Sequence, residues 1–124
     1  MGKISDLRIL SFHGIYDKKG RRDVSVVFEP EAGRFSELLG DSESLTTAID
    51  NRARFPERAS EVLERFDREY VKRAAPFDSV SFFCHGWRSG MEFGFTRLNA
   101  NRLAKAIAAV STPSVVVPLY LCST

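Results

Sequence analysis

Two apolar segments near the carboxyl end, with a helical pattern between them, most constrain what this chain can fold into. Residues 78–84 (DSVSFFC) and residues 115–122 (VVVPLYLC) are continuous apolar runs of strand length. Between them, residues 99–110 carry an apolar stripe at helical spacing. Continuous apolar strands that alternate with helices are typical of a parallel sheet covered on both faces. The class we expect is therefore α/β.

Two earlier segments predict further strands. Residues 7–15 (LRILSFHGI) are apolar on both faces and contain a glycine near their end. Residues 23–29 (DVSVVFE) form a second candidate that Pro30 closes, and a Lys- and Gly-rich turn at residues 17–22 separates the two. With the later segments, these strands predict a mostly parallel sheet flanked by helices in three layers.

Two more helices are expected between these strands. One is capped by Asp41 or Ser42 and runs to about Arg54. The clearest helix covers residues 57–74, with Pro56 as its first residue. Its apolar positions recur at helical spacing: Ala59, Val62, Leu63, Phe66 and Tyr70. The charged residues between them predict a solvated face, so this helix is expected to pack on the sheet through one side only.

Length and charge limit the function classes. A chain of 124 residues is long enough for one domain with a real core. The net charge of +2 is too small to favour nucleic acid or an anionic membrane as a partner. The amino terminus lacks a signal-peptide pattern, and no apolar run approaches the roughly 20 residues that span a bilayer. Only two cysteines are present, too few for a disulfide framework, so we expect a cytoplasmic protein.

The candidate chemistry lies at strand ends, because open α/β sheets bind ligands at the carboxyl ends of their strands. His13, His85 and Cys122 each come at or near such an end. One helix separates the strands that end in His85 and Cys122, so these strands are expected to be neighbours or near-neighbours in the sheet. A cysteine nucleophile needs a nearby base, which His85 could supply. The N–H groups of Gly86 and Cys122 could then form an oxyanion hole.

Structural roles compete with these assignments. Cysteine is among the most buried residue types, and Cys84 points away from His85 because it directly precedes it on a strand. His13 has an ordinary alternative as a hydrogen-bonded loop histidine. No HExxH or CxxC pattern indicates a metal, and no GxxxxGK[ST] or GxGxxG pattern indicates a nucleotide. We therefore expect no cofactor and no metal ion.

The segment from residue 78 to residue 124 resembles the core of caspase-like cysteine peptidases. This group, the caspase–hemoglobinase fold, includes caspases, metacaspases and CHAT-type proteases. Its pattern is an apolar strand that ends in His-Gly, then a helix, then an apolar strand that ends in the nucleophilic cysteine. SVSFFCHGW and VVVPLYLCST follow that order, with His85-Gly86 and Cys122 at the matching places.

The resemblance implies a cysteine endopeptidase that cleaves peptide bonds through an acyl-enzyme. Cys122 would attack the scissile carbonyl, His85 would act as general acid and base, and Gly86 N–H would help to hold the oxyanion. The loop after the first strand would help to select the substrate residue, so Arg21 or Arg22, with His13 nearby, would contact an acidic side chain. Peptides or proteins would be the substrates.

The same resemblance implies that the domain is incomplete at the carboxyl end. The family has further strands and helices after the catalytic cysteine, so residues 1–124 would be either a single domain or the large-subunit portion of a caspase-like domain, incomplete at the carboxyl end. The apolar strand at residues 115–122 would then need cover from a second copy or from the missing carboxyl-terminal subunit. Pro118 interrupts that strand, so we expect it either to mark a bulge or to make the segment a poorer strand candidate.

Two other interpretations stay open. The chain could be a non-catalytic caspase-like or other α/β domain used for interaction. It could also be the front half of an α/β-hydrolase-like enzyme, in which His85-Gly86 would serve an oxyanion hole and the nucleophile would lie elsewhere. Whether the chain is an enzyme at all depends on whether His85 and Cys122 converge.

Overall fold

The computed structural model describes residues 6–15, 28–41, 44–73 and 75–123, with the main chain alone for Phe28, Glu29, Cys122 and Ser123. The expectation of an α/β fold is confirmed. Helices and strands follow in this order: β1 (Ile9–Gly14), α1 (Phe28–Leu39), β2 (Leu45–Ile49), α2 (Phe55–Lys72), β3 (Phe77–Trp87), β4 (Gly90–Met91), β5 (Phe95–Thr96), α3 (Ala100–Val110), β6 (Ser111–Val116) and β7 (Leu119–Ser123).

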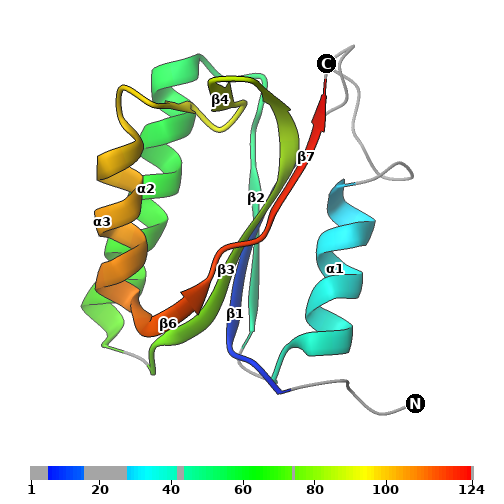
Figure 1. The fold of residues 1–124 in the computed structure, drawn as a ribbon, viewed down its shortest axis with the longest axis vertical. Helices are drawn as coiled ribbons and strands as arrows, with labels where there is room; N and C mark the ends of the chain where they lie inside the picture. Colours follow the sequence, from blue (N-terminus) through cyan, green and yellow to red (C-terminus); the bar gives the residue numbers. More distant parts are fainter. Residues whose placement is uncertain (1–5, 16–27, 42–43, 74, 124) are drawn as a thin grey trace.

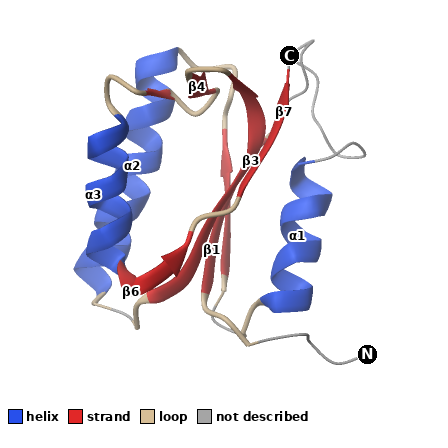
Figure 2. Cartoon of the chain, in the orientation of Figure 1, coloured by secondary structure: helices blue, strands red, loops and turns tan. Residues whose placement is uncertain are grey.

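The strands form one sheet with a helical layer on each face (Figure 1). Helices α2 and α3 lie side by side on one face, and α1 lies on the other (Figure 2). Within the sheet, β1 lies between β2 and β3, while β6 and β7 follow one another along the other side of β3. The long strand β3 is thus the centre of the molecule.

β1 confirms the strand expected at residues 7–15, and all of its residues are buried. It pairs in parallel with both β2 and β3. A parallel neighbour requires a crossover connection, which α1 supplies between β1 and β2. Ser44, just before β2, is hydrogen-bonded to the start of β1. Its Oγ accepts the Ile9 N–H at 3.0 Å and donates to the Leu7 carbonyl oxygen at 3.1 Å.

The segment between β1 and α2 differs from the expected elements. A strand is expected at residues 23–29. Residues 23–27 lie outside the described residues, and residues 28 and 29 are the first two residues of α1. The helix expected from Asp41 or Ser42 to about Arg54 is wrong, because residues 45–49 form β2. Its sequence, LTTAI, is rich in β-branched residues, which favour an extended chain beside an available strand.

Both helices of the α2–α3 layer confirm their sequence patterns. The helix expected at residues 57–74 appears as α2, with Pro56 in its first turn, and the helix expected at residues 99–110 appears as α3. Each turns one apolar stripe to the core. The buried apolar residues of the two stripes are Ala59, Val62 and Phe66 on α2, and Leu103, Ile107 and Val110 on α3.

The sheet is mixed, which corrects the expectation of a mostly parallel sheet. After β3 the chain turns back at once, so β4 pairs antiparallel with β3 and β5 pairs antiparallel with β4. The hairpin depends on Gly90, where an added Cβ would lie only 2.7 Å from the Phe95 carbonyl oxygen. The segment between β3 and α3 therefore adds two short strands to the sheet.

The apolar segment expected as one strand at residues 115–122 forms two strands, β6 and β7. Pro118 lies at the break, because proline has no N–H to donate to a strand ladder. Its carbonyl still accepts the Phe82 N–H at 3.1 Å, so the chain rejoins the edge of β3 immediately. Among the described strands β7 pairs with β3 alone, and it leaves 57% of Leu119, 52% of Tyr120 and 37% of Leu121 exposed.

The larger core lies between the sheet and the α2–α3 layer. Phe12 stacks on Phe82 with ring centroids 5.3 Å apart and contacts Phe66 at 5.2 Å. The face under α1 is smaller and more polar: Phe83 packs against α1, while Ser11 and Ser81 share a buried hydrogen bond of 2.9 Å. The two faces of the sheet therefore differ in character, and the candidate active-site histidine lies on the more polar one.

Candidate active site

His85 and Cys122 occupy paired positions near the carboxyl ends of β3 and β7. The expectation that these strands are neighbours is confirmed, with α3 as the connection between them. Adjacent strands lie roughly 4.8 Å apart, and paired positions belong to the same face of a sheet. The side chain of Cys122 lies outside the described residues, so the dyad itself stays a prediction.

The partly buried side chain of His85 belongs to the α1 face. His85 lies two residues after Phe83 on β3, so the two side chains are on the same face of the sheet. The ring centroid of Phe83 lies 5.8 Å from that of Phe35 in α1. Tyr120 also lies on this face, because its ring centroid is 5.4 Å from that of Phe83. Cys84, between Phe83 and His85, is fully buried in the core under α2 and α3. Its burial agrees with the structural role expected of it.

Gly86 is needed for packing against β7. A Cβ at this position would lie 2.8 Å from Leu121 Cδ1 and 2.9 Å from Leu121 Cβ. Main-chain groups alternate in direction along a strand, and the Phe82 N–H points to β7. By that alternation the Gly86 N–H also points to β7. Its assignment to an oxyanion hole, with the N–H of Cys122, stays a prediction.

The substrate-contacting residues expected after β1 are only partly described. His13 is 5% exposed, and its Nδ1 lies 3.2 Å from the Gly14 carbonyl oxygen. It pairs with Phe83 in β3, so it lies on the α1 face below the level of His85. Arg21 and Arg22 lie outside the described residues, and their contact with an acidic substrate stays a prediction.

Glu92 is the polar residue of this edge that the sequence patterns did not single out. One carboxylate oxygen, Oε1, accepts the main-chain N–H of His85 at 2.9 Å, and Oε2 accepts from Asn51 Nδ2 at 3.2 Å. Asn51 lies two residues after the end of β2, so these contacts connect three parts of the sheet edge. The available signal was a lone acidic residue between the apolar residues Met91 and Phe93, both of which are buried.

The loop that carries Glu92 is fastened to the first turn of α2. The Arg58 guanidinium donates a hydrogen bond to the Glu92 carbonyl oxygen. Gly94 has a φ of +93°, and a Cβ there would lie 2.6 Å from the Ala59 nitrogen. A side chain at Gly94 would therefore collide with α2, which explains why glycine stands where the loop crosses the helix.

An apolar hollow of about 280 Å³ lies on the opposite face of this edge, beside β7. It is bounded by the β4–β5 hairpin, the first turns of α3 and the exposed edge strand. The large apolar side chains that line it are Trp87, Met91, Phe95, Leu103, Leu119 and Leu121. Since Leu119 and Leu121 belong to the α3 face and His85 to the α1 face, the hollow and the histidine lie on opposite sides of the sheet.

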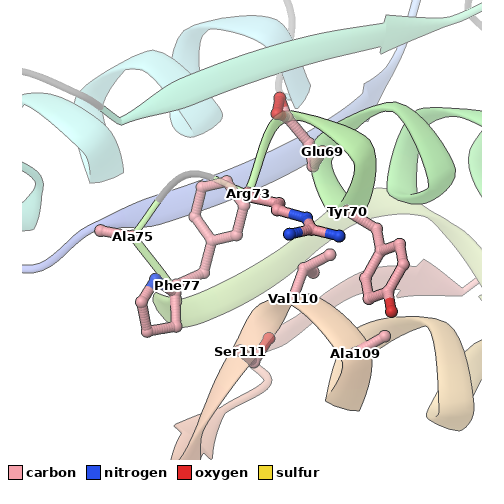
Figure 3. A pocket seen from close by; sticks show the side chains of 9 residues that line it. Glu69, Tyr70, Arg73, Ala75, Phe77, Ala109, Val110 and Ser111 are labelled. Carbon is pink, nitrogen blue, oxygen red and sulfur yellow. The ribbon is translucent and has the colours of Figure 1, made fainter.

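A second hollow, of about 250 Å³, lies at the far end of β3 (Figure 3). Figure 3 shows Arg73 and Tyr70 of the α2 end at its rim, facing Ala109 and Ser111 of the α3–β6 junction. The eight residue steps along β3 from Phe77, which lines this hollow, to His85 span roughly 26 Å at 3.3 Å per residue. It is therefore separate from the candidate active site.

Within residues 6–15, 28–41, 44–73 and 75–123, no group of three or more His, Cys, Asp or Glu side chains is placed to hold a metal ion. In the same part of the chain, no helix is both long enough and apolar enough to cross a lipid bilayer. Comparison with known protein families, curated proteins and solved structures found no match to this chain. Function is therefore inferred from the geometry of the sheet edge.

Proposed function

We propose that this protein is a cysteine endopeptidase in which Cys122 is the nucleophile and His85 the general acid and base. The observation that carries the proposal is the register of β3 and β7, which pairs the His85 position with the Cys122 position. At the strand spacing of roughly 4.8 Å, a thiol and an imidazole on one face can reach each other. No long-range contact is needed, since one strand–helix–strand unit supplies both residues.

In the proposed reaction, the Cys122 sulfur attacks the carbonyl carbon of the scissile peptide bond. The thiol proton passes to His85, which returns it to the leaving amine as the C–N bond breaks. A thioester then joins the acyl half of the substrate to Cys122. Water, deprotonated by His85, hydrolyses the thioester, which releases the carboxylic acid and restores the thiol. The N–H groups of Gly86 and Cys122 are the proposed oxyanion donors.

We propose the caspase-like fold as the finer class. In favour of it, β3 carries His85-Gly86 next to its last residue, α3 follows, and β7 carries Cys122 near its end, in the order that the resemblance implies. A helix on one face and two on the other agree with a three-layer arrangement. The proposal extends to an acidic substrate side chain bound by Arg21 or Arg22 beside His13, and to the cytoplasm, where free thiols persist.

The exposed edge strand supports a further part of the proposal, that a protein chain covers β7. Leu119, Tyr120 and Leu121 are more than one-third exposed on a strand that pairs on one side only among the described residues. Either a second copy or a carboxyl-terminal subunit would fill this role. The same exposure favours the second candidate function, an interaction domain without catalysis. The α/β-hydrolase-like alternative has no observation in its favour.

The proposal is tested with a peptide probe that carries a thiol-reactive electrophile at the scissile position. We expect intact-mass spectra to show one covalent adduct on the wild type and on Cys84→Ala, in which Cys122 is the one remaining thiol. Cys122→Ala and His85→Ala should lose the adduct, while circular dichroism shows both still folded. Peptide hydrolysis by folded Cys122→Ala would overturn the proposal. Absence of any adduct, together with binding of a partner chain at β7, would favour the interaction domain.

A further inference from the structure

Glu92 occupies a gap in the ladder on one side of β3. β1 pairs with β3 only as far as Phe83, and β4 begins to pair at Gly86. Since β7 takes the other side of β3 at both His85 and Gly86, β1 and β4 share the same side. The main chain of His85 lies in the gap between them, where neither strand supplies a ladder partner.

One residue fills that gap with two contacts. The Glu92 N–H donates to the His85 carbonyl oxygen at 3.0 Å, and the Glu92 Oε1 accepts the His85 N–H at 2.9 Å. Both main-chain groups of His85 are therefore bonded to Glu92. A hydrogen bond to a carboxylate is roughly twice as strong as one between neutral groups. The bond from the His85 N–H to Glu92 Oε1 is therefore stronger than the main-chain hydrogen bond that a neighbouring strand would supply.

Three other elements hold Glu92 itself. Its second carboxylate oxygen accepts from Asn51 after β2, and its carbonyl oxygen accepts from Arg58 of α2. The last residue of β1, Gly14, lies against the same pair, because a Cβ there would be 3.0 Å from Asn51 Nδ2 and 3.1 Å from Glu92 Oε1. Glu92 thus connects the carboxyl ends of β1, β2 and β3 to α2.

We infer that Glu92 is a positioning residue that fixes the main chain of His85, and with it the imidazole, relative to the Cys122 position. This inference rests on the proposed function for its catalytic consequence. Its structural content, that Glu92 anchors the His85 main chain, can be tested without any activity. A histidine on an unanchored strand end would sample positions away from the cysteine, and proton transfer is sensitive to such displacements.

The first test is amide hydrogen exchange of His85, measured by NMR. Glu92→Ala removes the acceptor, and we expect the exchange rate of the His85 amide to rise about tenfold or more, in line with loss of a hydrogen bond to a charged group. Glu92→Gln keeps an oxygen acceptor, and Asn51 can turn its amide to meet the new NH₂ group, so exchange should stay within about threefold of the wild type. Glu64→Ala is the matched control, because the Glu64 side chain is 63% exposed on α2, where it forms an ion pair with Arg68.

The second test separates positioning from general stability. We expect Glu92→Ala to lower kcat for peptide cleavage about tenfold with little change in KM, and Glu92→Gln to restore most of it. The rate of Cys122 alkylation at mildly acid pH should follow the same order among the variants. An unchanged His85 amide exchange rate in Glu92→Ala, or an equal rise in Glu64→Ala, would overturn the anchoring.

Failure of the proposed function gives a different result. If His85→Ala leaves Cys122 alkylation unchanged while Glu92→Ala still accelerates exchange at the His85 amide, the dyad is wrong and the anchoring holds. If His85→Ala abolishes alkylation while Glu92→Ala changes neither exchange nor kcat, the dyad holds and the positioning role is overturned.

Discussion

His85 on β3 and Cys122 on β7 are paired positions of two adjacent parallel strands, although they are 37 positions apart in the sequence. The hairpin β4–β5 and helix α3 occupy the intervening chain and return it to the side of β3. The pairing is a property of the backbone and does not depend on the rotamer of either side chain. A nucleophile and a base could therefore meet here as soon as the unit from β3 to β7 has folded.

Substitution of Gly86 tests whether this glycine is required for packing or for an oxyanion hole. We predict that Gly86→Ala destabilises the fold by about 1–3 kcal/mol, because the new methyl group overlaps Leu121. Adding Leu121→Ala should recover part of that loss, since it removes Leu121 Cδ1 and Cγ and leaves only the overlap with Cβ. Urea unfolding of the four proteins in the cycle measures the coupling. Strictly additive free energies would contradict the contact. Recovered stability without recovered peptidase activity would support the oxyanion role.

A pair of glycines tests the docking of the Glu92 loop on α2. Gly94→Ala should destabilise the fold by about 1–3 kcal/mol, because Gly94 has a φ of +93° and an added Cβ would collide with Ala59. Gly33→Ala, within α1, meets nothing within 4 Å and should stabilise by about 0.5–1 kcal/mol. Urea unfolding curves measure both changes. Equal effects at the two positions would show that the loop does not pack on α2 as described.

Glu61 predicts a pH dependence of stability. Burial, together with the charges of Asp50 and Glu64, raises the pKa of the Glu61 carboxyl, and Arg68 partly opposes the shift. Because the folded pKa lies above the unfolded one, the folded state loses stability as pH rises from the ordinary carboxyl pKa through the raised value. Glu61→Gln should therefore melt at a higher temperature than the wild type at neutral pH, and the difference should vanish in acid.

The matched control for Glu61 is Glu57→Gln in the first turn of α2. The Glu57 carboxylate lies 2.8 Å from Arg54 Nε and near the positive end of the helix dipole. Its removal should lower stability at neutral pH by up to about 1 kcal/mol, opposite in sign to Glu61→Gln. Melting curves of the wild type, Glu61→Gln and Glu57→Gln at several pH values measure the sign of each change in stability. The same sign for both variants would contradict the assignment of the Glu61 shift.

The sequence patterns predicted the elements whose signal is local. The helix at α2 carries an unbroken apolar stripe after Pro56, and the strand at β3 is an uninterrupted apolar run, so each specifies its own conformation. The neighbouring positions of His85 and Cys122 followed from one topological rule applied to a strand–helix–strand unit. That part of the candidate site needed no knowledge of the remaining fold.

The parts that could not be predicted depend on tertiary contacts. β2 has only five residues, and its extended conformation is stabilised by pairing with β1 rather than by a pattern of its own. Glu92 gave no signal because its role depends on the place where β1 ends beside β3, which no local spacing records. The sequence predicts an interruption at Pro118, because proline cannot donate to a strand ladder. It does not predict that β6 and β7 both continue to pair with β3.

The most direct test of the central claim is the rate of Cys122 alkylation by iodoacetamide as a function of pH. Cys84→Ala, with Cys122 as the one thiol, is compared with Cys84→Ala/His85→Ala from about pH 5 to about pH 9, across the ordinary thiol pKa of about 8.5. With His85 present, we predict reaction at pH 6 about tenfold or more faster than in the double variant, because a histidine partner stabilises the thiolate. Superimposable pH profiles for the two proteins would show that His85 does not act on Cys122, and would contradict the dyad.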